Sequence, residues 1–255
     1  MRVIGKAFIL SIGLAVIACT ASFGAQQQEK AVVQLMAPAE LEKAGDMSRA
    51  QKDYAQAIKY YNEALSKDKK NAKLYNKLGL AELSMGEYGA ARTYFTKATK
   101  YDHNYPEAWN DLGVVSFVER KYGAAVRYFQ KAIALDETHA SFHVNLGITW
   151  FTQNNMDNAM GEYTRALQLD PEALMHTSHT GLSAQIVSRE DRAKQDFMLA
   201  KIFAKLGNAD SCFVCLERAK EDGYPDLARV YKDEEFASFR QDARMASIAP
   251  PPISK

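Results

Sequence analysis

A repeat of 34 residues restricts the folds open to this chain more than any other feature. Units begin at residues 38, 72, 106 and 140, and certain places in the unit keep the same kind of residue each time. The eighth place is always glycine, the twentieth and twenty-seventh are always alanine, and the twenty-fourth is always aromatic. These places hold Gly45, Gly79, Gly113 and Gly147; Ala57, Ala91, Ala125 and Ala159; Ala64, Ala98, Ala132 and Ala166; Tyr61, Phe95, Phe129 and Tyr163. Self-similarity at this period predicts an array of identical supersecondary units.

Within each unit the pattern predicts two antiparallel helices. Places 17, 20, 24 and 27 follow the i, i+3, i+4 spacing of one buried helix face. Small residues at places 8, 20 and 27 let the two helices cross closely, and aromatic residues at places 17 and 24 are expected to fill the gap to the next unit. Turn residues fall between the helices at Gly86-Glu87, Arg120-Lys121 and Asn154-Asn155.

The pattern resembles the tetratricopeptide-repeat (TPR) family. The resemblance implies an all-α fold, a right-handed superhelix of about five helix-turn-helix repeats. Four tandem units occupy 38–71, 72–105, 106–139 and 140–173. A degenerate fifth unit at 193–226 keeps Ala200, Cys212, Leu216 and Ala219, and an insertion at 174–192 precedes it. Ser188 with Asp191 is expected to cap the helix that enters the fifth unit.

The C-terminal region is expected to close the stack. Residues 227–245 carry apolar side chains at helical spacing among charges, which predicts a helical cap over the last repeat. Residues 246–255, with three consecutive prolines at 250–252, are predicted to form a disordered tail.

The first 25 residues predict export. Arg2 and Lys6 precede a run that is apolar from Ala7 to Ala18 apart from Ser11, the composition of a signal peptide. Residues 16–19, Val-Ile-Ala-Cys, resemble a bacterial lipobox, which would make Cys19 the lipidated N-terminus. Ordinary cleavage after Ala21 or Gly24 and an uncleaved anchor are the alternatives. Residues 26–37 would be a tether, and the protein is expected to be periplasmic or a membrane-anchored lipoprotein, or alternatively secreted.

The TPR resemblance also implies a ligand groove on the first helix of each repeat. The groove places carry apolar residues with asparagine beside them. An asparagine can donate to and accept from a peptide backbone, which favours a protein or peptide ligand. The predicted groove residues are Asn76, Leu80, Leu83, Asn110, Val114, Phe117, Asn145, Ile148 and Phe151. Phe117 is the expected central anchor. The basic carboxylate clamp of chaperone-binding TPR proteins is not reproduced, since Leu80, Val114 and Met198 occupy its places.

Other functional classes find little support in the sequence. The formal net charge is +1 with no basic block, which argues against nucleic-acid binding. Cys212 and Cys215 fall inside a predicted helix, as core thiols or as a strained local disulfide. His176 and His179 in the insertion make half a metal site at most. The other histidines, His103, His139 and His143, are expected at the surface or in packing. No catalytic motif or cofactor site is evident.

The sequence therefore predicts a non-catalytic scaffold in the cell envelope that binds a protein or peptide. Membrane contact is expected only through the N-terminal lipid or signal. Two alternatives remain open. One is a structural protein whose repeats self-associate, and the other is an enzyme accessory or metal-binding protein that uses the insertion at 174–192.

Overall fold

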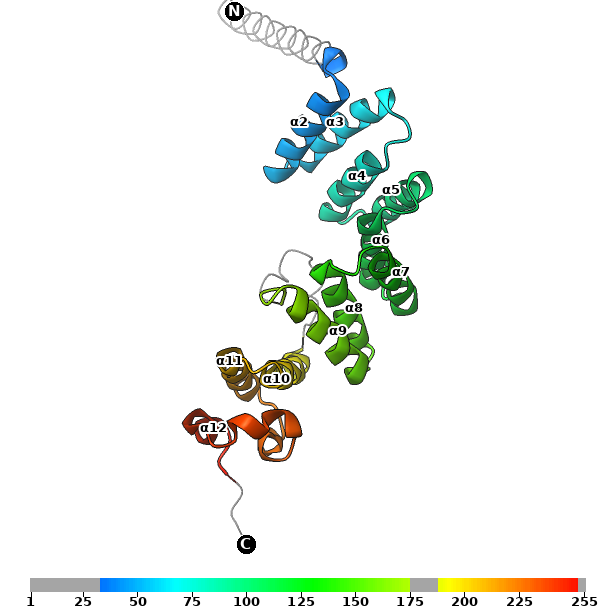
Figure 1. Cartoon of the computed structure of the whole chain (residues 1–255). Coiled ribbons are helices and arrows are strands. Elements are labelled where there is room, and N and C mark those ends of the chain that lie inside the picture. The colour runs from blue at the N-terminus through cyan, green and yellow to red at the C-terminus, as the bar shows by residue number, and fades with distance from the viewer. Residues whose placement is uncertain (1–32, 175–187, 252–255) are drawn as a thin grey trace, which may run out of the picture. The chain divides into compact units, whose positions relative to one another are not determined.

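A computed structural model describes residues 33–174 and 188–251, and every regular element within those ranges is a helix. The chain divides into two compact bodies, one up to His103 and one from Asn104 onward. Figure 1 shows the helices following one another in pairs. The predicted all-α class and the ten repeat helices are confirmed, with two helices in each of five repeats.

The first body contains the first two repeats. Helices α2 (Pro38–Ala50) and α3 (Tyr54–Lys67) form one antiparallel pair, and α4 (Ala72–Ser84) and α5 (Tyr88–Tyr101) form the next. Asp53 caps α3 and Asn71 caps α4, each through a side-chain oxygen that accepts a backbone N–H of the first turn. Part of the predicted tether belongs to this body, because Val33 and Met36 pack against its core.

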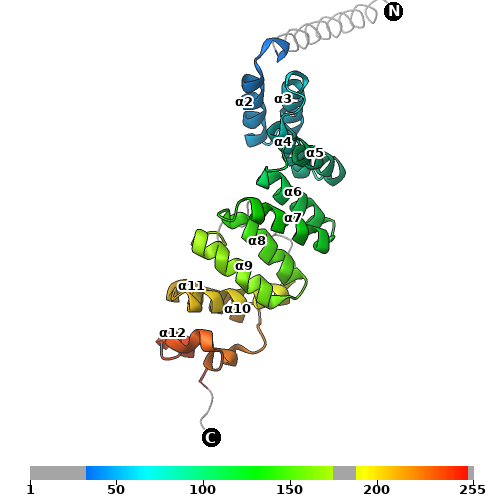
Figure 2. The same cartoon turned by 45° about the vertical axis from the view of Figure 1, so that its right-hand side comes forward.

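The second body contains three repeats and the C-terminal cap. Its pairs are α6 (Pro106–Val118) with α7 (Tyr122–Leu135), α8 (Ala140–Thr152) with α9 (Met156–Leu169), and α10 (Arg189–Lys205) with α11 (Ala209–Glu221). Figure 2 shows α8 beside α9 and α10 beside α11. The cap consists of two short 3-10 helices, η3 (Leu227–Tyr231) and η4 (Glu234–Phe239), and of α12 (Ala243–Ile248).

The invariant glycine and the invariant aromatic residue of each repeat meet inside that repeat. A β-carbon placed on Gly45, Gly79, Gly113 or Gly147 would fall within 3.0 Å of ring carbons of Tyr61, Phe95, Phe129 or Tyr163 respectively. Each ring thus packs across its own helix pair, which the sequence analysis did not predict. Only a residue without a side chain leaves room for the ring. The Tyr163 ring also reaches the next repeat, where its hydroxyl accepts a hydrogen bond from the Gln195 amide of α10 at 3.3 Å.

The turn between the two helices of each repeat has one left-handed residue at place 15. Lys52, Gly86, Arg120, Asn154 and Gly207 have φ angles of 63°, 81°, 60°, 59° and 74°. The turns predicted at 86–87, 120–121 and 154–155 are thus where the structure has them. This conformation costs little for glycine and about 1–2 kcal/mol for a residue with a β-carbon.

Two boundaries differ from the sequence prediction. Helix α10 begins at Arg189, four residues before the predicted fifth unit, because Ser188 caps it as expected and accepts a hydrogen bond from the Asp191 backbone N–H at 2.9 Å. Helix α12 extends to Ile248, so the first residues of the predicted tail are structured. Ile248 and Ala249 are both buried, which is the reason the chain stays ordered there.

The cap closes the last repeat with the apolar residues that the sequence indicated. Val230 and Phe236 are fully buried, and the ring of Phe236 lies 5.7 Å from that of Phe197 on α10. Lys201 of α10 forms ion pairs with Asp233 and Glu235 of the cap, and these side chains are largely shielded from solvent. The predicted cap at 227–245 is thus present and is joined to α10 by apolar contacts and by ion pairs.

Candidate functional site on the first helices of the repeats

In the first body the predicted groove residues lie on α4 and remain partly accessible. Asn76 is buried, whereas Leu80 and Leu83 are half-buried and share one face of the helix. Lys77 lies one turn before Leu80, and its ammonium is 2.6 Å from carboxylate oxygens of both Glu42 and Asp46 on α2. The first body therefore presents a half-buried leucine pair next to a fixed charge cluster.

The charge cluster on α2 and α4 is anchored to the core. Tyr61 is fully buried, and its hydroxyl donates to the Asp46 carboxylate at 2.8 Å. Burial acts to lower the pKa of Lys77, but the hydrogen bonds that its ammonium donates to Asp46 and Glu42 more than offset this, so the pKa is raised. Lys77 thus remains a cation whose position is set by two carboxylates.

In the second body the two predicted asparagines are buried and bound to each other. Asn145 of α8 donates its side-chain N–H to the Asn110 side-chain oxygen of α6 at 2.8 Å. Asn110 in turn donates to the Asp111 carboxylate at 3.1 Å. Asn145 has no exposed surface. The pair joins α6 to α8, so a polar group that the sequence assigned to a ligand is a buried link between repeats.

The four apolar groove residues of the second body are also buried. Val114 and Phe117 on α6 and Ile148 and Phe151 on α8 have exposed fractions of 6%, 3%, 1% and 6%. The expectation of an exposed Phe117 anchor is therefore wrong: its ring packs edge-on against Tyr122 of α7 at 5.3 Å. The sequence could not show this, because a groove place and a core place carry the same apolar residue types.

The sequence analysis missed a second pair of places that link the two helices of a repeat. Places 4 and 23 hold stacked rings, Tyr75 with Tyr94 at 6.4 Å and Trp109 with Tyr128 at 6.0 Å. The fourth repeat replaces this pair with His143. The signal was readable, because both places are aromatic in repeats two and three.

His143 is buried and both of its ring nitrogens have acceptors. Nδ1 lies 2.7 Å from the Glu162 carboxylate and Nε2 lies 3.2 Å from the Glu137 carbonyl. His143 is thus a packing residue, as expected, and holds α8 to α9. His139 is exposed and stacks on Phe142 at 4.5 Å.

Cys212 and Cys215 are free, buried thiols. Burial raises the pKa of each to about 12, so the thiolate is disfavoured and the reading as core residues is supported. Over residues 33–174 and 188–251, no three His, Cys, Asp or Glu side chains are grouped to hold a metal ion. In the same ranges no helix has the length and apolar character needed to cross a membrane. Cys19, His176 and His179 lie outside the described residues.

Comparison with protein families identifies the repeats. Two family models described as tetratricopeptide repeat match the chain, one over residues 48–112 and one over residues 117–173. No curated protein matches the sequence significantly. The matched ranges include the whole helix pairs α4–α5 and α8–α9.

Solved structures agree on the fold. The structure of MamA protein superposes with a TM-score of 0.51 at 21% identity, covering 77% of this chain and 95% of that one. A thermophilic TPR protein of Thermus thermophilus, TTC0263, gives a TM-score of 0.50 at 18% identity, covering 79% and 98%. At these identities the likeness concerns the fold alone. The two family matches, over residues 48–112 and 117–173, and the paired helices identify the chain as a tetratricopeptide-repeat protein.

Proposed function

We propose that this TPR protein is a non-catalytic scaffold that holds a protein or peptide partner on the first helices of its repeats. The observation that carries the proposal is the half-buried pair Leu80 and Leu83 on α4, beside the fixed charge of Lys77. TPR proteins as a class present such helix faces to partners rather than carrying out chemistry.

The geometry of α4 suits an apolar side chain of a partner. Leu80 and Leu83 are one helical turn apart, so one incoming side chain can contact both. Transfer of such a side chain out of water contributes about 1.5–3 kcal/mol before the cost of ordering the partner. Lys77, Glu42 and Asp46 line the neighbouring turn, where they offer both signs of charge to the partner's polar atoms.

The six groove residues of α6 and α8 have a different place in this proposal. Their burial leaves them no surface for a partner, so we assign them to the interior that supports the repeats. Ligand contact through these six residues stays a prediction. The proposal itself rests on the accessible leucines of α4.

We further propose that the scaffold works in the cell envelope. The support is the N-terminal sequence: a basic start, an apolar run, and Cys19 in a lipobox-like context. A lipid on Cys19 would tether the repeats to a membrane surface while leaving their helix faces open to a partner.

The experiment is crosslinking in the native cell from a photoreactive residue at Ser84, which is exposed at the end of α4, followed by mass spectrometry of the captured partners. In a Leu80→Asp, Leu83→Asp double variant the captured partners should be lost while the circular dichroism spectrum stays helical. Val214→Asp is the matched control, because Val214 is an exposed apolar residue on α11. Capture of the same partners at the parent's yield by the double variant would refute the α4 site.

A further inference from the structure

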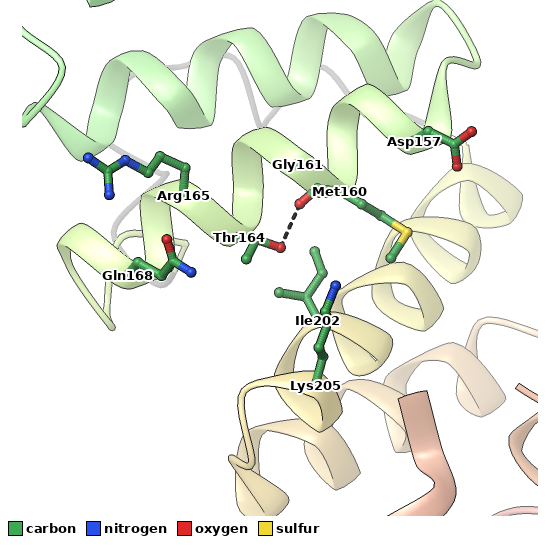
Figure 3. A pocket seen from close by; sticks show the side chains of 8 residues that line it. All are labelled: Asp157, Met160, Gly161, Thr164, Arg165, Gln168, Ile202 and Lys205. Atoms are coloured by element: carbon green, nitrogen blue, oxygen red, sulfur yellow. Dashed lines mark hydrogen bonds between the residues drawn. The ribbon is translucent and has the colours of Figure 1, made fainter. Parts of the chain in front are cut away.

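A cavity of about 360 Å³ opens between α9 and α10 in the second body. Figure 3 shows its two walls. We call it the α9–α10 wedge. The wall on α9 and the wall on α10 are formed mainly by Met160, Gly161, Thr164 and Arg165, and by Ile202 and Lys205. None of these residues belongs to the predicted groove on the first helices.

The wedge exists because the fourth and fifth repeats do not pack like their neighbours. Met160, at place 21 of its repeat, is half-buried on the α9 wall. Helices α9 and α10 pack less closely against each other than α3 does against α4 or α7 against α8.

The centre of the wedge is apolar and its polar groups are partly used. Met160 from α9 and Ile202 from α10 face the same space. The Thr164 hydroxyl donates to the Met160 carbonyl at 2.7 Å, as the dashed line in Figure 3 marks. A thioether side chain adapts to apolar groups of different shapes. The centre thus suits one aliphatic or aromatic side chain.

One end of the wedge carries positive charge without a partner. Arg165 and Lys205 both line the wedge and form no ion pair with any described residue. In Figure 3 the Lys205 amino group lies beside Ile202, whereas the Arg165 guanidinium points away from Lys205. Among the described residues that line the wedge, the one acid is Asp157, which lies at the opposite end of α9.

The lysines next to the wedge differ in this respect. A second cavity of about 370 Å³ shares Asp157 and Met160 with the wedge and includes Lys194 and Lys201. Lys194 pairs with Glu190 at 2.7 Å and Lys201 pairs with Asp233 at 3.1 Å. These two lysines thus each pair with an acidic side chain of the chain. Among the described residues, no acidic side chain pairs with Arg165 or Lys205. The unpaired cations mark the end of the wedge where an external carboxylate is favoured.

We propose that the α9–α10 wedge is a docking site for an extended acidic segment of a partner protein. An apolar side chain of the segment fills the space between Met160 and Ile202, and separate carboxylates of the segment bind Lys205 and Arg165. The chain's own insertion does not fit this description, because residues 175–187 contain no Asp or Glu. The site is separate from α4, so it stands or falls independently of the proposed function.

Gly161 offers a way to block the wedge without disturbing the fold. A β-carbon at Gly161 meets nothing within 4 Å, and the residue is exposed in the lining of the wedge. Gly161→Phe should therefore fill the cavity and keep α9 helical, since glycine is a poorer helix former than phenylalanine. Gly123→Phe on α7 is the matched control, because its β-carbon also meets open space, away from the wedge.

The test is a selection from a random dodecapeptide display library on the immobilised full chain, followed by fluorescence anisotropy with the best synthetic peptide. We expect selected peptides with Asp or Glu next to Leu, Met or Phe. Gly161→Phe should abolish binding, and Lys205→Glu and Arg165→Glu should each weaken it about tenfold, as expected for loss of a charge-assisted contact. Gly123→Phe and Leu83→Asp should bind as the parent does.

The other outcomes overturn the proposal. Peptides without acids, binding unchanged by Gly161→Phe, or no selected peptide at all would each show that the wedge is not an acidic-segment site. Binding lost in Leu83→Asp and kept in Gly161→Phe would move the contact to α4 and support the proposed function alone. The variants must melt no lower than the parent, which separates loss of binding from loss of fold.

Discussion

Gly113 of α6 faces the ring of Phe129 of α7 so closely that a β-carbon on the glycine would lie 2.5 Å from a ring carbon. Gly147 and Tyr163 repeat the relationship, with a β-carbon 2.7 Å from the ring. This contact explains why two places sixteen residues apart stay constant through four repeats. In the fifth repeat the two places hold Ala200 and Leu216, so a larger first residue accompanies a smaller second one.

Replacing Gly113 with leucine should destabilise the second body. The new side chain has to displace the fully buried Phe129 ring, and overpacking of this kind costs about 1–3 kcal/mol. Urea unfolding followed by circular dichroism measures the loss. Gly123→Leu is the control, since its β-carbon meets open space and its stability should match or exceed the parent's. Equal melting of the parent and Gly113→Leu would contradict the assigned contact.

Replacing Asn145 with alanine should cost stability rather than binding alone. The change removes the donor at 2.8 Å from the Asn110 side-chain oxygen and leaves a buried acceptor unpaired. Such a group costs about 1–3 kcal/mol. The midpoint of urea unfolding should fall accordingly. A variant as stable as the parent would contradict the stabilising role of this hydrogen bond.

Replacing Asp196 with asparagine should stabilise the protein at neutral pH. Burial raises the pKa of the Asp196 carboxyl to about 6, with Asp222 adding to the rise and Arg218 and Arg192 opposing it. Because the folded pKa lies above the unfolded value, this group's contribution to stability is full below the unfolded pKa and is lost as the pH rises through about 6.

The stability difference between Asp196→Asn and the parent should therefore change with pH. At pH 7 the variant should gain about 1–2 kcal/mol, less than full conversion of the pKa shift, because solvent screens this partly exposed carboxyl. The gain should shrink toward pH 4. Unfolding in urea at several pH values gives the difference in unfolding free energy between the variant and the parent. The effects of all other carboxyls are present in both proteins and cancel in this difference. A difference that is constant from pH 4 to 7 would be evidence against a raised pKa.

The two thiols of α11 should not react in the folded protein. With pKa values raised to about 12 and almost no exposed surface, Cys212 and Cys215 present little thiolate at pH 8. Iodoacetamide should modify neither in native buffer and both in urea, as read by intact mass. The measurement uses the Cys19→Ala chain so that only these two thiols are counted. Rapid alkylation in native buffer would argue against core thiols.

Cys19 should carry lipid when the chain is made in a bacterial host. A palmitate analogue should label the parent and not Cys19→Ala, and the variant should leave the membrane fraction while its repeats stay helical. Labelling of the parent would exclude ordinary signal cleavage. A shortened but unlabelled parent would exclude the lipobox and favour cleavage after Ala21 or Gly24.

Much of the fold was predictable because it is specified within single repeats. The glycine, alanine and aromatic places recur every 34 residues, and the turns fall at place 15 as expected. The contact between place 8 and place 24 within one repeat was not predicted, because place 24 was assigned to the gap between repeats. Spacing along the chain shows that two residues face the same side, but not which neighbour they meet there.

The sequence by itself determined the five helix pairs, their register and their turns, because small residues, aromatic residues and caps act over one or two helical turns. Only the tertiary structure decided which first-helix residues stay accessible. Phe117 and Leu83 occupy the same place in successive repeats, yet one is buried and the other half-buried. The wedge between α9 and α10 was likewise invisible in the sequence. Burial depends on how each repeat packs against its neighbours, and the 34-residue period does not encode that packing.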